Sequence, residues 1–379
     1  NLVQAPYNVL PNISATYNIQ LSPVVSDASG KYLALPTGPK TTFSTDYTRF
    51  AYNVNSNLAY APAGYLYSQA DRTVIKGAMS LPQVTPGYYI TPKVSFQSNT
   101  YAATAAVTSS NPLGAAPPAQ GFTIPTFSLD SGLAFERDAA ELKGFFGRDM
   151  LLTMEPRAYY VYTPYQDQSL TPLFDTADAG FGVTQIFSEN TFIGNDRIAD
   201  NNKLTGGLTS RMIEAGTGAE RANVTVAQRQ SFTGQKVGLN GNIANPTTYS
   251  DTLGSASVRL LGNFSADMFG QYNTQLNKFV QTTVGGSWRP TPGRSLNFGY
   301  RNVWSPPTQA FGPTQATLAQ TTTDQYYGSG QWPLTRDVSV LGRWGYDALT
   351  TKTLNTLIGL EWTRDCWTFR SVYSQLLNT

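Results

Sequence analysis

The stretch VQTTVGGSWRPTPGRSLNFGYR, residues 280–301, decides the fold class because its side-chain character changes at nearly every step. Before the turn sequence RPTPGR, apolar or small side chains occupy alternate positions: Val280, Thr282, Val284, Gly286 and Trp288. After the turn, Leu296, Phe298 and Tyr300 alternate with polar or small residues. Successive side chains of a β-strand point to opposite faces. The stretch therefore predicts two antiparallel strands, each with one apolar and one polar face.

The same alternation recurs along the chain, most clearly after residue 120. It is visible in FSADMFGQYN (264–273), VSVLGRWGYD (338–347) and LNTLIGLEW (354–362). Short turn sequences and longer polar tracts, such as residues 305–325, separate these segments. Strands of about ten residues with such turns and loops are typical of outer-membrane barrels, and the sequence predicts roughly eighteen of them. The rows expected to face lipid include Ala266, Met268 and Tyr272, and Val280, Val284 and Trp288.

Composition excludes several other classes of protein. Charged residues make up 13% of the chain, the net charge is +2, and there is no His. A nucleic-acid interface would usually need a basic stripe. Without His the usual general base and metal ligand are absent, so no Ser/His/Asp site can form and neither an enzyme nor a cofactor is expected. The chain opens with NLVQAPYNVLP, which has no Met and no basic leader, and this favours a fragment of a longer precursor.

The fold class expected is therefore all-β, as a large antiparallel transmembrane β-barrel that occupies residues 1–379 without a linker. A soluble sandwich or propeller is the alternative, and it would carry a charged outer face. Here the second face is mostly uncharged and polar, which suits a wet lumen. Aromatic residues near strand ends are candidates for the interfacial girdle: Trp288, Tyr300, Trp344, Tyr346 and Trp362.

The first 120 residues alternate less regularly. NISATYNIQL (12–21) predicts a strand. The segments YAPAGYLY (60–67) and SLPQVTPGYYITPK (80–93) contain prolines. Proline cannot donate a ladder hydrogen bond, so strands in these segments are expected to be short or at an edge.

Two strand-like segments contain charged or hydroxyl-bearing residues at positions expected to face inward. In LTMEPRAYYVYTPYQDQS (152–169) these are Glu155, Arg157 and Tyr159, and Pro156 predicts an edge, a bulge or a local break in pairing. In PTFSLDSGLAFERD (125–138) they are Ser128, Asp130 and Glu136. Inward charges in a barrel usually tune a pore or hold a plug.

The stretch SENTFIGNDRIADNNKLTGGLTSR (188–211) concentrates acids, bases and amides. Asp196 and Asp200 are four residues apart among asparagines, which is loosely similar to an oxygen-rich calcium loop. The spacing of an EF-hand is absent. The simpler interpretation is a polar loop that joins two strands.

Four segments of the chain resemble the LptD family of lipopolysaccharide-assembly proteins, also called OstA or Imp. They occur in the family's order: PTFSLDSGLAFER (125–137), EPRAYYVYTPYQDQS (155–169), FSENTFIGNDRIADNNKLTGGLTSR (187–211) and the shorter DCWTFRSVYSQ (365–375). The resemblance implies an outer-membrane translocon of a Gram-negative bacterium that inserts lipopolysaccharide (LPS) into the outer leaflet through a barrel lumen and a lateral seam. A general porin, a passive channel on the same architecture, is the alternative function.

The resemblance also implies partners and residue roles. An LptE-like lipoprotein would plug the lumen, and an LptA-type periplasmic bridge would deliver LPS through an N-terminal jelly-roll domain. That domain, the first strands and the last strands are expected to lie outside residues 1–379, so the barrel portion need not close. Asp196 and Arg197 are expected to fix the loop that contains them.

Cys366 also gains a role from the resemblance. Family members have cysteines in this late region that pair with cysteines of the N-terminal domain, in an oxidising compartment. This chain has a single Cys followed by Trp367 where two adjacent cysteines are usual. An inter-domain disulfide at Cys366 is predicted, with a free thiol as the alternative.

Overall fold

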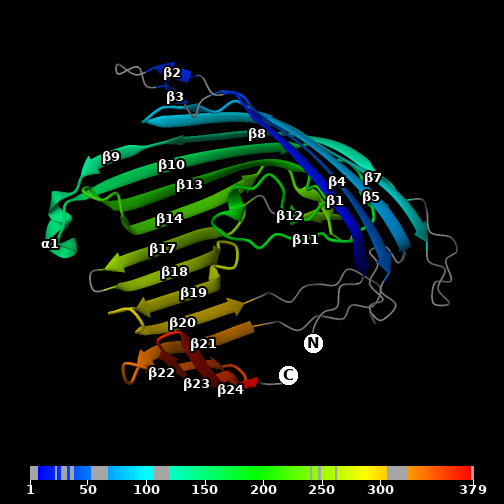
Figure 1. Ribbon diagram of the computed structural model, residues 1–379. Coiled ribbons are helices and arrows are strands. Elements are labelled where there is room, and N and C mark those ends of the chain that lie inside the picture. Colours follow the sequence, from blue (N-terminus) through cyan, green and yellow to red (C-terminus); the bar gives the residue numbers. More distant parts are fainter. Residues whose placement is uncertain are drawn as a thin grey trace. The chain divides into compact units, whose positions relative to one another are not determined.

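The computed structural model is almost entirely β (Figure 1). It describes residues 7–21, 24–26, 32–34, 38–52, 67–105, 119–239, 241–245, 249–260, 263–304 and 322–376. Eighteen of the described strands belong to one sheet whose paired neighbours run antiparallel, which agrees with the predicted class and count. None of the helices in these ranges is long and apolar enough to cross a membrane.

The chain divides into two compact units. Unit 1 comprises residues 1–134, 156–206 and 229–250. Its long strands pair in the order β1, β4, β5, β7, β8, β10. Their bounds are Tyr7–Gln20, Lys40–Tyr52, Tyr67–Ser80, Tyr88–Ala105, Phe122–Leu133 and Met150–Thr163, and β10 enters the unit at Pro156. The short elements are β2 (Val24–Ser26), β3 (Tyr32–Ala34), β6 (Gln83–Val84), β11 (Ala177–Asp178), η3 (Gln185–Phe187), β12 (Phe192–Ile193), β15 (Gln235–Gly238) and β16 (Gly241–Asn245).

Unit 2 comprises residues 135–155, 207–228 and 251–379. Two strands are shared with unit 1 along their length: β13 (Asn201–Glu214) and β14 (Glu220–Ser231). From β14 onward each strand pairs with the next as an antiparallel meander. The strands are β17 (Thr252–Leu260), β18 (Phe264–Asn273), β19 (Lys278–Trp288), β20 (Ser295–Trp304), β21 (Thr322–Pro333), β22 (Val338–Asp347), β23 (Lys352–Arg364) and β24 (Trp367–Leu376). The segment before them holds β9 (Phe135–Asp138), η2 (Ala140–Leu142) and α1 (Lys143–Phe146).

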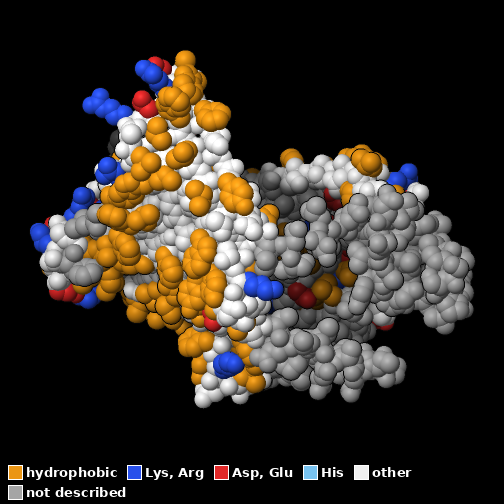
Figure 2. All heavy atoms as spheres, turned by 90° about the horizontal axis from the view of Figure 1, so that it is seen from below, with side chains coloured by type: hydrophobic (Ala, Val, Ile, Leu, Met, Phe, Trp, Pro, Cys, Tyr) orange, Lys and Arg blue, Asp and Glu red, His pale blue; other side chains and the backbone are white. Residues whose placement is uncertain are grey.

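The strand register of unit 2 confirms the alternation of faces. Directly opposed residues share a face, and one row of such partners runs across the meander: Val224, Ala256, Met268, Val284, Tyr300, Tyr326 and Tyr346. The next row on the other face is polar or small: Ser257, Asp267, Gly285, Gly299 and Tyr327. Figure 2 shows one side of the molecule, where hydrophobic side chains gather in a broad band and charged side chains lie mostly at its margins.

The prediction that Val280 faces lipid is wrong. A β-bulge lies there, because Gln271 pairs with Gln281 but Tyr272 pairs with Phe279, which leaves Val280 as the extra residue. A bulge changes the direction of the side chains around it. Phe279 therefore takes the outward place beside Tyr272, with ring centroids 5.1 Å apart, and is 53% exposed, whereas Val280 is buried.

The prolines of SLPQVTPGYYITPK bound one short strand, the two-residue β6, as expected, but they do not keep the next strand short. β7 has 18 residues with Pro92 inside it. On one side β7 pairs with β6 up to Ile90 and with β5 from Lys93 onward, so Pro92 lies opposite the break between two neighbouring strands. Pro156 has the corresponding place in β10, between the pairing with β9 and the pairing with β8, and is the local break that the sequence predicts. The segment YAPAGYLY lies outside the described residues except for Tyr67.

Candidate functional site

The candidate site is the contact between the strands of unit 1 and a segment of the same unit, residues 164–200, that we call the inner segment. It contains η3, β11 and β12 and lies on the inner side of the curve formed by the strands of this unit (Figure 1). Its most buried side chains are both apolar and charged: Ile186, Ala199, Asp196 and Arg197 are each at most 1% exposed. A surface loop would leave such groups in water.

Arg72 of β5 is the centre of the contact. Its side chain is 1% exposed, and its guanidinium donates to Asp175 Oδ2 at 2.6 Å and to Asp196 Oδ1 at 2.7 Å. Tyr101 of β7 donates its hydroxyl to the same oxygen of Asp196 at 2.9 Å. The second oxygen of Asp196 accepts the backbone N–H of Phe174 at 2.7 Å. Two strands of the sheet and two parts of the inner segment are thus joined through one buried carboxylate.

The two carboxyl groups differ in their electrostatic environment. Burial has the largest effect on both, and it raises the pKa of Asp196. For Asp175 burial also acts to raise the pKa, but the hydrogen bonds and charge of Arg72 outweigh it and lower the pKa below its ordinary value. Asp175 therefore retains the negative charge that balances Arg72.

An aromatic stack lies beside this ion pair. The rings of Phe174 and Phe50, from β4, are 4.4 Å apart and within 9° of parallel. Arg72 lies 4.9 Å from the ring centre of Phe50. Stacking and cation–π contact add to the ion pair. Two parts of the inner segment's backbone approach each other closely at Gly194. This residue has φ +85°, and a Cβ there would collide with the backbone oxygen of Asp175.

Arg197 and Asp200 hold the inner segment through backbone groups. Arg197 donates to the carbonyl oxygens of Thr171 at 2.8 Å and Pro172 at 3.0 Å. Asp200 accepts the N–H groups of Lys236 at 2.9 Å and Val237 at 2.9 Å, in the β15–β16 hairpin. Each charged side chain thus satisfies two backbone groups, as buried backbone requires.

A second contact region lies around η3. Glu189 accepts from Lys93 of β7 at 3.0 Å and from Ser128 of β8 at 2.6 Å. Arg157 of β10 forms a bidentate ion pair with Asp130, with its shorter contact at 2.6 Å, and lies 4.3 Å from the ring centre of Phe187. Side chains from three strands, β7, β8 and β10, therefore contact the inner segment at and just after η3.

The charged groups of the site are directed at one another and at backbone groups. No group of three or more His, Cys, Asp or Glu that could hold a metal is present among the described residues. Asp196 and Asp200, the pair that loosely resembled a calcium loop, are directed at different partners.

A family model described as "LptD: LPS transport system D" matches residues 3–344. The chain belongs to the LptD family.

Curated relatives agree with this membership of the LptD family. The LPS-assembly protein LptD of Cupriavidus pinatubonensis is 40% identical over 356 residues, which is 93% of this chain and 41% of that protein. Its counterpart in Cupriavidus metallidurans is 43% identical over 340 residues, or 88% of this chain and 38% of that protein. The protein of the same name in Ralstonia nicotianae is 37% identical over 377 residues, or 98% and 41%. The chain thus spans about two fifths of the length of these relatives.

The LptD-like segments bring together some of the residues that the sequence selects and not others. Asp130, Arg157 and Tyr159 lie together at the contact with Phe187, and Tyr159 is only 7% exposed. Glu155, in unit 2, instead forms an ion pair with Arg211 at 2.7 Å. Glu136 is exposed and lies opposite Thr153 in the strand register.

The girdle candidates of this LptD-family chain lie in two groups along the meander. Trp288 and Trp362 lie next to short turns and contact two aromatic rings that the sequence did not select, Trp332 at 6.0 Å and Trp367 at 5.4 Å. The other group comprises Tyr300 beside Tyr326 at 5.0 Å and Trp344 beside Tyr346 at 5.5 Å. Cys366 is exposed in the turn between β23 and β24, at the end where Trp362 lies.

Sequence reasoning missed the centre of the site. Arg72, Tyr101 and Asp175 were not selected. Arg72 shares its strand face with the apolar residues Ala70 and Val74, so alternation gives no sign of an inward charge. The one usable signal was the density of polar residues in 188–211, which contains Glu189, Asp196, Arg197 and Asp200.

Proposed function

We propose that this chain is the barrel portion of an outer-membrane LPS translocon, which inserts LPS into the outer leaflet through the lumen and a lateral seam. Membership of the LptD family supports this proposal, and so do the printed names of the relatives. The observation that carries it is the two-faced meander of unit 2. Its apolar rows suit lipid, and its polar rows suit a water-filled lumen that an amphipathic glycolipid can cross.

The partners proposed follow from the family. LPS would arrive over an LptA-type bridge and an N-terminal periplasmic domain of the full-length protein, and an LptE-like lipoprotein would occupy the lumen. The process is transport without covalent chemistry, so no enzymatic activity and no cofactor are proposed. The inner segment supports this division of roles, because its charged groups are used to hold backbone and strands together.

Cross-linking at two adjacent residues tests the proposal. A photo-reactive residue at Thr283 of the full-length protein, expressed in its own outer membrane, would lie on the polar face, and one at Val284 on the apolar face. We expect adducts with LPS or a lipoprotein from Thr283 and adducts only with membrane lipid from Val284. Tyr159 is a poor position for this experiment because Phe187 covers it. If both positions gave adducts with membrane lipid and neither gave an adduct with LPS or a lipoprotein, the translocon would be rejected.

We also propose that Cys366 forms a disulfide with a periplasmic domain of the full-length protein. Its exposure in a short turn supports this role, since barrels place their short turns on the periplasmic side. The full-length protein should migrate differently with and without reductant, and Cys366→Ser should abolish the difference. Identical mobility in all three samples would show that the thiol is free.

A further inference from the structure

A pocket of unit 2 is lined by positively charged side chains to which the proposed transport function assigns no role. It lies at one end of β17 to β20, next to the turn 289–294, and has a volume of about 600 Å³. Small-molecule sites occupy roughly 300–1,000 Å³. Four of its described lining residues are arginines and none is Asp or Glu: Arg221, Arg259, Arg289 and Arg294.

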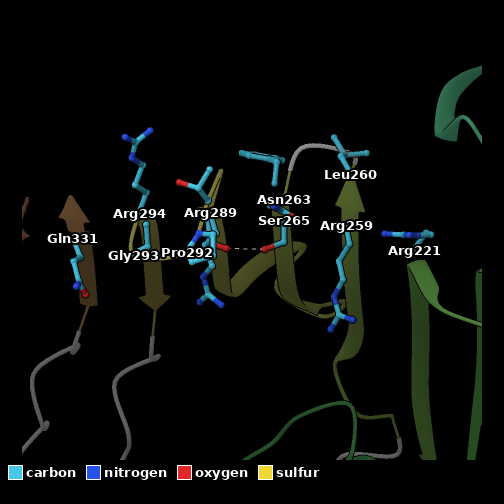
Figure 3. Close-up of a pocket in the computed structure, with 14 residues that line it drawn as sticks. Arg221, Arg259, Leu260, Asn263, Ser265, Arg289, Pro292, Gly293, Arg294 and Gln331 are labelled. Carbon is cyan, nitrogen blue, oxygen red and sulfur yellow. Dashed lines mark hydrogen bonds between the residues drawn. The ribbon is translucent and has the colours of Figure 1, made fainter. Parts of the chain in front are cut away.

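The four arginines are not equivalent. Arg221 is neutralised by Glu214 at 2.6 Å, and Arg294 lies 5.1 Å from the ring centre of Trp332. Arg259 and Arg289 have no carboxylate partner among the described residues and are exposed. In Figure 3 these two side chains and Gln331 extend to the same side, whereas Arg294 points the other way. Two guanidinium groups without a carboxylate partner among the described residues therefore line the pocket.

Neutral donors complete the pocket on the polar face of the sheet. Ser265 and Ser287 are cross-strand partners whose hydroxyls are hydrogen-bonded at 2.8 Å (Figure 3). Whichever hydroxyl donates, the hydrogen of the other is free for a further acceptor. Gln331 adds an amide N–H₂ group. Guanidinium, hydroxyl and amide donors around a space without carboxylates are the chemistry that recognises a phosphate group.

We infer that this pocket binds a phosphate group, with Arg259 and Arg289 as its main charged ligands, and that the phosphate belongs to an anionic lipid headgroup. The phosphate site itself rests on the arginines. Its assignment to a lipid rests on the proposed function, in which a phosphorylated glycolipid enters from the periplasm. The turn 289–294 beside the pocket is short, and short turns of barrels face that compartment.

A pair of double variants tests the inference. The full-length protein in phosphatidylcholine nanodiscs would be titrated with fluorescent diphosphorylated lipid A and, separately, with its dephosphorylated form. Arg259→Gln/Arg289→Gln removes two positive charges from the pocket. Arg301→Gln/Arg343→Gln removes two exposed arginines of unit 2 elsewhere and is the matched control. Heat-modifiable mobility on gels shows whether each variant is folded.

We expect the pocket variant to bind the diphosphorylated lipid about tenfold or more weakly than wild type, with the control within about twofold. The dephosphorylated lipid should bind all three proteins alike. Displacement of the lipid by millimolar inorganic phosphate would indicate that the phosphate group alone is recognised, and no displacement would indicate a larger headgroup site. Equal binding by the pocket variant and the control would overturn the inference. The binding assay needs no transport, so the site can stand even if cross-linking at Thr283 rejects the translocon.

Discussion

The strand faces that carry the charged side chains are covered in different ways in the two units. In unit 1 the inner segment covers the face, and charged groups are fully buried: Arg72 is 1% and Asp196 0% exposed. In unit 2 comparable groups such as Arg259, Arg301 and Arg343 remain exposed. Both solutions obey the same rule, because a polar group must bond either to the protein or to something outside it. The stability of unit 1 is therefore expected to depend on hydrogen-bond and ion-pair partners inside the protein. The stability of unit 2 is expected to depend on whether each face contacts lipid, water or a ligand.

Removing the central arginine of unit 1 should have the largest effect. Arg72→Met leaves the buried Asp196 and the more exposed Asp175 without their counter-charge, and breaking a buried ion pair costs about 3–5 kcal/mol. Loss of folded mobility on heating, or urea unfolding in detergent, would measure the change. Arg343→Met, on the exposed polar face of unit 2, is the matched control and should change stability by less than about 0.5 kcal/mol. Equal losses in both variants would remove the distinction between the two faces.

The two faces of unit 2 can be distinguished by introducing an arginine at either of two adjacent positions. Val284→Arg places a cation on the apolar row between Met268 and Tyr300, at a cost of about 2–4 kcal/mol if that row lies near the middle of the bilayer. Thr283→Arg places it on the polar row, where water can solvate it. Folding yield into lipid vesicles compares the two variants. If Thr283→Arg were the more damaging, the assignment of the two faces would be reversed.

The contrast between the units also explains what the sequence could predict. Alternation predicted the meander of unit 2 because one face must contact lipid and the other water. The polarity of each side chain therefore indicates the face on which it lies. It failed at Val280, because a bulge is set by the register with β18 and not by local preference.

In unit 1 the sequence could only indicate that a polar stretch mattered. The partners of Asp196 include Arg72, which is 124 residues distant in the chain, and no periodicity links them. Pro156 was correctly predicted to mark a break in pairing. Pro92 occupies an equivalent break, and both strands continue past their prolines; at Pro92 the neighbour on the other side, β8, still pairs.

Glycine substitutions compare the two units at positions with similar backbone conformation. Gly194 in unit 1 has φ +85° and Gly293 in unit 2 has φ +81°, but only Gly194 would place a Cβ against backbone. Gly293→Ala should cost about 1 kcal/mol through the left-handed conformation alone, and Gly194→Ala about 2–3 kcal/mol because a collision is added. Thermal unfolding of the two variants measures both values. Equal costs would mean that the inner segment relaxes freely around Gly194.

The smallest effect on stability should come from two ion pairs of similar exposure, one in each unit. Asp130–Arg157 has side chains 24% and 38% exposed, and Glu155–Arg211 has side chains 27% and 41% exposed. Asp130→Asn and Glu155→Gln should each cost about 1 kcal/mol or less, since partly exposed pairs are strongly screened. Only Arg157 also lies over Phe187 of the inner segment. Asp130→Asn should therefore speed amide hydrogen exchange in residues 185–189, whereas Glu155→Gln should not. Faster exchange there in both variants, or in neither, would mean that Arg157 does not anchor the inner segment, and that Glu189 and Arg72 hold it without that contact.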